Sequence, residues 1–299
     1  MGPKPARIPL PDIDHETHVA HKSAVTLPPA PAGYEILGIA GRGGMARVYR
    51  ARHLKLGRTV ALKMLPTDAE ESLTARFIEE ARSAASLQHP QVAAIFEVSS
   101  DEQQPFLAME YASGGTLAQR LAGRPQPPRE AVALLAGLAR AVQHCHDHGI
   151  IHRDLKPANV LLVEEGESVA YKISDFGLAK RLDDDKGLTK TGEVMGTPAY
   201  MAPEQASGAF KGVGPAADIY SLGAMLYECL TGRPPFDGTD AMDIVLQVLA
   251  DEPLRPRQLQ PTLPRDLETI CLKCLEKSPR RRYASALALA EDLERWLAG

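Results

Sequence analysis

The sequence predicts an α+β fold with two lobes, in which a small antiparallel sheet with one main helix precedes a larger and mostly helical part. Between residues 34 and 110, short apolar runs bounded by glycine or polar turns are typical of strands. After Gly114-Gly115, apolar residues recur at helical spacing over longer stretches. A chain of 299 residues exceeds one minimal domain and suits two lobes that share a cleft. This order of a sheet-rich part before a helical part is an α+β arrangement.

Residues 1–32 are expected to form a flexible arm. They contain seven prolines and few large apolar residues, so the segment cannot bury enough surface to offset the entropy of ordering. His15, His18 and His21 recur there at intervals of three and could bind a metal. Without acidic or cysteine partners on an ordered scaffold, a solvated tail is favoured.

The elements then follow in order. The pattern before residue 111 predicts strands and one helix, and His89-Pro90 ends that helix. The predicted strands are 34–39, 46–53, 59–65, 93–98 and 106–110, and the predicted helix is 72–87. The second part predicts helices at 128–146, 216–231, 241–250, 263–276 and 285–297.

Composition excludes several classes of function. A formal net charge of −4 gives no broad basic field, so nucleic-acid binding has no electrostatic support. No stretch approaches the roughly 18 apolar residues that span a bilayer, and the N-terminus lacks a signal-peptide core, so no membrane contact is expected. The four cysteines lie in apolar, helix-like contexts, which favours a reducing cytoplasm.

Cys271 and Cys274 form the only CxxC pair. Such a pair can ligate zinc or carry redox chemistry, but no second pair follows it. Apolar residues around it recur at helical spacing, so two small buried thiols on one helix face are favoured.

The segment His152-Arg-Asp-Leu-Lys-Pro-Ala-Asn159 carries the strongest chemical signal. Asp154 could accept the proton of an attacking hydroxyl, Lys156 could face the phosphoryl oxygens, and Asn159 could hold a metal. Asp175-Phe-Gly follows sixteen residues later, so an ordinary polar loop would need two coincidences in the right order.

These motifs, with others from residue 34 to 297, resemble the catalytic domain of bacterial eukaryotic-like Ser/Thr protein kinases of the protein kinase superfamily. The resemblance implies a protein kinase-like fold: an N-lobe at residues 33–109, a hinge at 110–112 and a C-lobe at 113–299. It implies ATP and Mg²⁺ as cofactors, with Mn²⁺ as the alternative ion. Partners would be protein substrates with Ser or Thr acceptors, and the chain itself by autophosphorylation, for which a transient homodimer would serve.

The glycine-rich run that begins at Gly41 resembles the loop that covers the phosphates, because backbone amides approach where side chains are absent. Its members by resemblance are Gly41, Gly43, Gly44, Ala46 and Val48, with Ala46 standing where a third glycine is usual.

Lys63 ends a Val-Ala-Leu-Lys strand and would pair with the α- and β-phosphates. By resemblance Glu80 would hold Lys63, and Glu79 is the runner-up. The adenine pocket would be lined by Val48, Ala61, Met109 and Leu161, and the hinge would contribute Glu110 and Ala112; each apolar member could equally be plain core.

Asn159 and Asp175 would ligate the metal through hard oxygen atoms. Thr197, in a segment that ends in Ala-Pro-Glu and resembles the substrate-docking segment, would bond toward Asp154 and Lys156. Small-molecule kinases lack that docking segment, which disfavours them.

Arg153 is expected to be buried and uncompensated until an anion arrives, and phosphorylated Thr189 or Thr191 would supply one. Two structural contacts are also predicted: Asp218 bracing the catalytic loop, and Arg282 pairing with Glu204. A pseudokinase scaffold that binds nucleotide without turnover is the alternative function.

Overall fold

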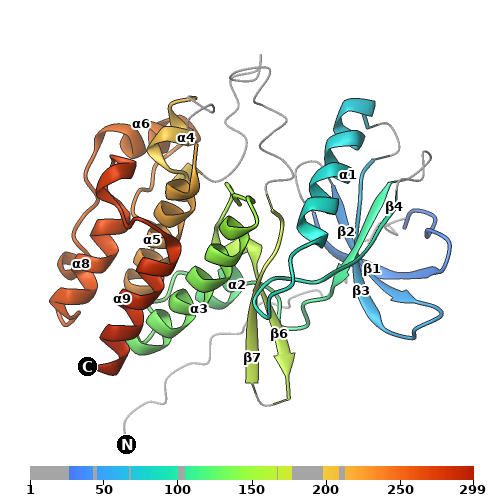
Figure 1. Cartoon of the computed structure of the whole chain (residues 1–299), viewed down its shortest axis with the longest axis horizontal. Coiled ribbons are helices and arrows are strands. Elements are labelled where there is room, and N and C mark those ends of the chain that lie inside the picture. The colour runs from blue at the N-terminus through green and yellow to red at the C-terminus, as the bar shows by residue number, and fades with distance from the viewer. Residues whose placement is uncertain are drawn as a thin grey trace, which may run out of the picture.

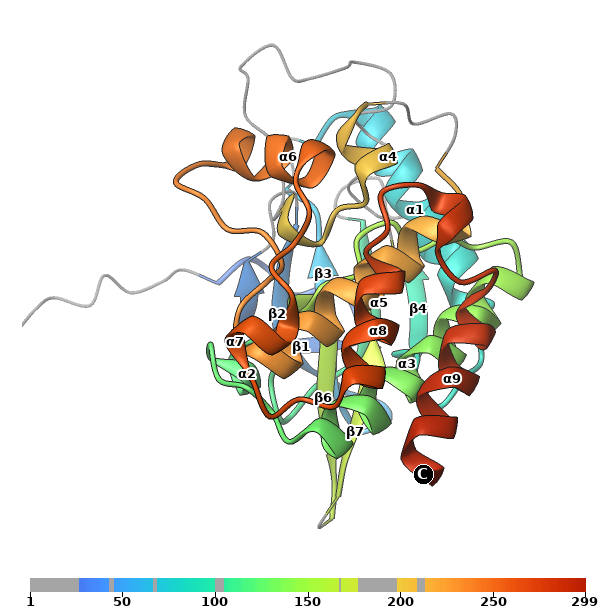
Figure 2. The same cartoon turned by 90° about the vertical axis from the view of Figure 1, so that its left-hand side faces the viewer.

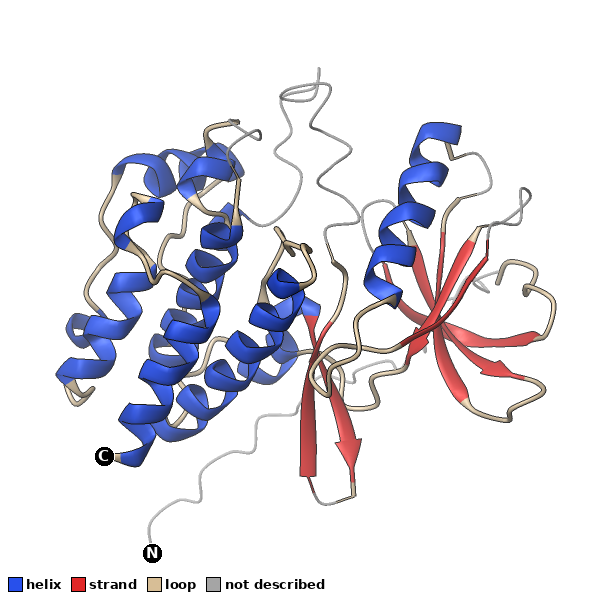
Figure 3. Cartoon of the chain, in the orientation of Figure 1, coloured by secondary structure: helices blue, strands red, loops and turns tan. Residues whose placement is uncertain are grey.

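The structure is a computed structural model, and it describes residues 27–42, 46–66, 69–99, 105–166, 168–176, 198–208 and 213–299. Side chains of Arg42, Glu80, Glu165 and Ser168 are not described. The sheet and helix α1 form one lobe and the remaining helices form the other, with a β-hairpin between them (Figures 1 and 3). Both expectations for the fold class, an antiparallel-sheet lobe and a helical lobe, are confirmed.

The first lobe is built on a five-stranded antiparallel sheet within the described residues, in the order β1-β2-β3-β5-β4. Its strands are β1 (Tyr34–Arg42), β2 (Arg47–His53), β3 (Thr59–Met64), β4 (Ile95–Ser99) and β5 (Phe106–Glu110). The register of β2 on β3 pairs Val48 with Lys63, and that of β3 on β5 pairs Ala61 with Met109. Alternation then sends Val48, Ala61, Lys63 and Met109 to one face.

Helix α1 (Glu71–Ala85) covers that face (Figure 1). Phe77 and Ala81 of α1 are buried against Ala61, Leu107 and neighbouring apolar residues of the sheet. The apolar stripe holds the helix against the sheet. Its N-cap residue makes no side-chain hydrogen bond, whereas at the other end Ser86 Oγ donates to the Ser83 carbonyl at 2.7 Å.

The helical lobe centres on α5 (Pro215–Thr231), which is buried along nearly its whole length. Around it pack α3 (Pro128–Asp147), α8 (Arg265–Cys274) and α9 (Ala286–Ala298), as Figure 2 shows. The other helices are short or peripheral: α2 (Leu117–Leu121), α4 (Pro203–Ala206), α6 (Ala241–Ala250) and α7 (Pro256–Leu259).

Cys271 and Cys274 of α8 are fully buried free thiols, which confirms that prediction. Cys271 Sγ lies 3.7 Å from the carbonyl oxygen of Gly223 in α5. A methyl group at Gly223 would overlap Cys274 Cβ, so the glycine permits the close approach of α5 and α8.

The sequence analysis missed the hairpin of β6 (Val160–Glu165) and β7 (Ser168–Ile173). Its strand β7 also touches the sheet lobe: the Ile173 amide donates to the Gln91 carbonyl at 2.8 Å, and the Ala93 amide donates to the Ile173 carbonyl at 2.9 Å. The strand thus joins the two lobes just before Asp175.

No helix among the described residues is long and apolar enough to cross a membrane.

Candidate active site

The loop between α3 and β6 is held by a carboxylate buried beneath it. Asp218 of α5 is fully buried, and it accepts the backbone amides of His152 and Arg153, each at 2.8 Å. His146 Nε2 lies 2.8 Å from the same carboxylate. A buried carboxylate is stable only with such donors, so Asp218 fixes the loop as predicted.

His152 links this loop to the residue before Asp175. Its Nδ1 accepts the Asp154 amide at 3.2 Å, so the ring proton lies on Nε2, which donates to the Ser174 carbonyl at 2.9 Å. The ring also packs against Phe176, with centroids 4.8 Å apart. One side chain therefore sets the spacing between the backbones that carry Asp154 and Asp175.

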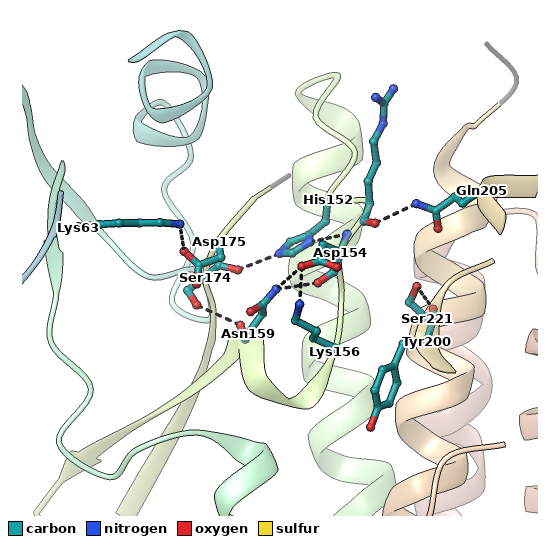
Figure 4. Close-up of polar contacts among 11 residues, drawn as sticks. Lys63, His152, Asp154, Lys156, Asn159, Ser174, Asp175, Tyr200, Gln205 and Ser221 are labelled. Carbon is teal, nitrogen blue, oxygen red and sulfur yellow. Dashed lines mark hydrogen bonds and ion pairs between the residues drawn. The ribbon is translucent and has the colours of Figure 1, made fainter. Parts of the chain in front are cut away.

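The Asp154 carboxylate lies at the centre of the polar contacts drawn in Figure 4. Its Oδ2 accepts Lys156 Nζ at 2.8 Å and Asn159 Nδ2 at 3.1 Å. Asn159 Nδ2 also donates to the Asp154 carbonyl at 2.8 Å. These bonds orient the carboxylate. The Asp154 side chain remains 20% exposed, so a hydroxyl group can still reach it.

Lys63 and Asp175 face each other across the cleft from the two lobes. Lys63 Nζ donates to Asp175 Oδ1 at 2.7 Å. Burial alone would raise the pKa of Asp175, but the ion pair with Lys63 outweighs burial and holds that pKa below its ordinary value. The carboxylate is therefore charged and ready to hold a cation.

Two residues beside the reacting groups have left-handed backbones. Arg153 has a φ of 63° and Asp175 a φ of 61°. Such a conformation costs a residue other than glycine about 1–3 kcal/mol and persists only where the surroundings enforce it. At Arg153 the enforcing contacts include Asp218 at the amide and Gln205 at the carbonyl.

Asn159 and Asp175 fit a divalent cation. Both recorded hydrogen bonds of the Asn159 side chain use its nitrogen. The amide oxygen is therefore the atom of this side chain that could ligate a metal. Together with the Asp175 carboxylate it offers the hard oxygen atoms that Mg²⁺ and Mn²⁺ prefer.

The residues predicted to line an adenine pocket come together. Ala61 and Met109 are buried in one apolar cluster, against which Val48 and Leu161 pack from two lobes. Ala46 is also buried in this cluster, and Gly41 pairs with Val48 where β1 meets β2. The cluster forms an apolar surface beside Lys63, suited to a flat heteroaromatic ring.

Glu110, at the end of β5, carries an ion pair that sequence reasoning missed. Glu110 Oε1 lies 2.7 Å from Lys172 Nζ of β7, and its Oε2 accepts the Ala94 amide at 3.2 Å. The side chain of Glu110 is thus engaged by protein, and its backbone amide donates to the Ala94 carbonyl at 2.9 Å, whereas the predicted partner residue Ala112 is half-buried.

On the other side of Asp154 lies the segment that ends in Ala-Pro-Glu (Figure 4). Tyr200 donates its hydroxyl to Glu228 at 2.6 Å, and Ser221 donates to the Tyr200 carbonyl at 2.8 Å. Burial raises the pKa of both Tyr200 and Glu228. These bonds fix Tyr200 against α5.

Glu204 and Arg282 form the predicted pair. Two parallel bonds join them, Nη1 to Oε1 at 2.7 Å and Nη2 to Oε2 at 2.8 Å. The Arg282 side chain is fully buried, and it also donates to the carbonyls of Ala216, Glu276 and Lys277. The guanidinium therefore anchors α4 to the lobe.

Some predicted site residues fall outside the described part: Gly43, Gly44, Thr189, Thr191, Thr197 and the side chain of Glu80. Lys63 has Asp175 as its recorded partner, and the runner-up Glu79 is exposed on α1. Arg153 is half-buried, so the expectation of a buried side chain was wrong. The backbone of Arg153, by contrast, is fully engaged, because its amide and its carbonyl both form hydrogen bonds.

Comparison with known proteins explains this arrangement. The sequence pattern described as "Protein kinase domain" matches residues 34–293. The chain belongs to the protein kinase family. Members of the family use ATP and a divalent metal, in agreement with the groups gathered around Asp154 and Asp175.

Named Ser/Thr kinases of bacteria are among its relatives. It is 40% identical over 274 residues to a probable serine/threonine-protein kinase of Streptomyces coelicolor, 38% over 270 to PknB of Mycobacterium tuberculosis, and 38% over 264 to PrkC of Bacillus subtilis. These alignments cover 89%, 88% and 87% of this chain, and 40%, 42% and 40% of the relatives. The kinase chain thus spans about two fifths of their length.

The kinase fold has a close counterpart among solved structures. The PknI kinase domain of Mycobacterium tuberculosis, solved as a C20A mutant, superposes with a TM-score of 0.69 at 27% identity. The match covers 90% of this chain and 96% of that domain.

Proposed function

We propose that this chain is a protein Ser/Thr kinase that transfers the γ-phosphoryl group of ATP to serine or threonine hydroxyls of proteins. The observation that carries the proposal is the convergence of Lys156 and Asn159 on Asp154, beside an Asp175 that is ion-paired with Lys63. Lys63, Asp154, Lys156 and Asp175 supply charged groups, and Asn159 a neutral amide, of the kinds that phosphoryl transfer uses.

Each group has one task in this proposal. Asp154 orients the acceptor hydroxyl and takes its proton as oxygen bonds to phosphorus and the bond to ADP breaks. Lys156 lies close enough to Asp154 to face the transferred group, and Lys63 binds the phosphates. The divalent cation neutralises the phosphate charge; Asn159 and Asp175 would hold it, and we propose Mg²⁺, with Mn²⁺ as the alternative.

Control would operate through Arg153. Phosphate on Thr189 or Thr191 would add about two negative charges and charge-assisted bonds to this arginine, ordering the segment before the Ala-Pro-Glu motif. The chain would then be its own substrate, through a transient homodimer. We also propose the division into an arm (1–32), N-lobe (33–109), hinge (110–112) and C-lobe (113–299). A cytoplasmic location is supported by the four buried free thiols.

The test measures incorporation of labelled phosphate from ATP and Mg²⁺ into the purified chain and into a generic basic protein. Wild type is compared with Asp154→Asn, and the labelled residues are mapped. Label on Thr189 or Thr191 that falls by about 10² to 10⁴-fold in the variant is the expected result, because a general base contributes that much.

A pseudokinase that binds ATP without turnover is the alternative from another class. Retained ATP binding with no label in wild type would favour it and overturn the proposal. The intact Lys63, Asp154, Asn159 and Asp175 argue against it, since loss of one such group is the usual mark of a pseudokinase.

A further inference from the structure

Gln205 is a buried polar residue to which the mechanism above assigns no role. It directly follows Glu204 at the start of α4, and only 5% of its surface is exposed. Both ends of its side chain are bonded. Oε1 accepts the Ala202 amide at 3.2 Å, and Nε2 donates to the Arg153 carbonyl at 2.9 Å. Gln205, labelled in Figure 4, thus joins the Ala-Pro-Glu segment to the residue before Asp154.

The peptide group that Gln205 reaches is the one that carries Asp154. Its oxygen is the Arg153 carbonyl, and its nitrogen is the Asp154 amide, which donates to His152 Nδ1 at 3.2 Å. A planar peptide bonded at both oxygen and nitrogen cannot rotate without breaking a bond. The peptide plane before Asp154, and with it the position of the Asp154 Cα, is therefore fixed from two sides, by Gln205 and His152.

This peptide follows a left-handed residue, since Arg153 has a φ of 63°. Asp218 holds the amide of Arg153 at 2.8 Å, and Gln205 holds its carbonyl. With the carbonyl released, the Arg153 backbone can relax toward the common right-handed regions, turning the peptide and the base with it.

We propose that Gln205 is a positioning residue for the base, transmitting the placement of the Ala-Pro-Glu segment to Asp154 through the Arg153 carbonyl. The inference rests on the proposed function. The inference predicts a lower kcat with unchanged ATP binding. Gln205 has no recorded bond to Lys63 or to the apolar cluster beside it, which are the groups proposed to bind ATP.

The experiment compares Gln205→Met with Gln205→Glu in the full chain. Methionine preserves length but removes both bonds, whereas glutamate can still accept from the Ala202 amide and, when ionised, cannot donate to Arg153. Both variants should lower kcat by roughly 10 to 100-fold with little change in KM for ATP, since small misplacement of a base has that effect. The glutamate variant should recover part of its kcat as pH falls and its carboxyl gains a proton.

Gln143→Met is the matched control. Gln143 also uses both ends of its side chain, accepting the Leu287 amide at 3.1 Å and donating to Asp147 at 2.7 Å, but it joins α3 to α9 away from the cleft. Gln143→Met should leave kcat at the wild-type value, because neither bond of Gln143 reaches Arg153 or Asp154.

Amide hydrogen exchange at Asp154 gives a readout that needs no activity. Exchange should accelerate in Gln205→Met and not in Gln143→Met. Equal kcat in the two methionine variants, or unchanged exchange at Asp154, overturns the role of Gln205. A wild-type chain that transfers no phosphate overturns the proposed function instead, and the exchange comparison still tests the positioning.

Discussion

At the scale of single residues, the pair of Lys63 and Asp175 couples protonation to structure. The pair holds the pKa of Asp175 below its ordinary value of 3.8. A carboxyl whose pKa is depressed by folding stabilises the fold fully above its unfolded pKa, and this stabilisation is lost as pH falls through the folded pKa. The pair therefore stabilises the chain at neutral pH and ceases to do so in acid.

Lys63→Met should accordingly destabilise the chain more at about pH 7 than at about pH 2, because the stabilisation that the pair supplies is lost as pH falls through the depressed pKa of Asp175. Denaturant unfolding at the two pH values measures the difference. Lys55→Met, at an exposed position of the β2–β3 turn, is the control and should show no such dependence. A loss of stability in Lys63→Met that is the same at both pH values would contradict the coupling.

The spacing of motifs was enough to predict which residues gather around Asp154, because Lys156 and Asn159 lie within one turn of chain. It was not enough to predict the recorded partner of Lys63, which lies 112 residues away in the other lobe. Nor did it reveal Gln205, whose side chain bonds a carbonyl 52 residues earlier. Partners of this kind depend on how lobes and loops meet, which no local pattern contains.

At the scale of elements, two arginine–glutamate pairs with similar bonding differ in burial. Arg282 and Glu204 join α4 to the core with side-chain exposures of 0% and 15%. Arg140 and Glu294 join α3 to α9 with exposures of 46% and 41%. A buried charge that loses its partner is far more costly than an exposed one.

We expect Glu204→Ala to lower the free energy of unfolding by about 3–5 kcal/mol, because it leaves Arg282 buried and uncompensated. Glu294→Ala should cost at most about 1 kcal/mol. Urea unfolding of both variants, alongside wild type, is the measurement. Similar losses in the two would mean that burial of Arg282 does not govern the energetics of the pair.

Most strands and helices lie within one or two residues of their predicted limits, because each has a clear apolar period and a breaking residue. The hairpin of β6 and β7 was missed for a physical reason. Its two runs of six residues are short and lie among helices, so their apolar residues suit either a strand or a helix turn. Gly166 between two apolar runs was the available signal.

At the scale of the whole molecule, the helical lobe encloses all four thiols. Cys145, Cys229, Cys271 and Cys274 are each at most 1% exposed. Burial raises the pKa of Cys145 and of Cys229 to about 12, so almost no thiolate forms at neutral pH.

A thiol reagent at about pH 8 should therefore label the native chain only as fast as the helical lobe opens, and label all four thiols after unfolding. The denaturant midpoint for labelling should coincide with that for loss of helical circular dichroism. Gly223→Ala, whose added methyl would overlap Cys274, should accelerate labelling. Rapid native labelling of the wild-type chain would show that a thiol is reached without unfolding.

The bonds from Ile173 to Gln91 and Ala93 have a mechanical consequence. The chain after β5 and these two bonds are backbone attachments between the lobes, beside the Lys63–Asp175 and Glu110–Lys172 ion pairs. Two attachment points define an axis of rotation. Asp175 lies two residues from one of them, whereas β1 lies at the sheet edge farthest from β4 and β5. A rotation of the two lobes about this axis would move β1 through a wide arc while Asp175 stays nearly still.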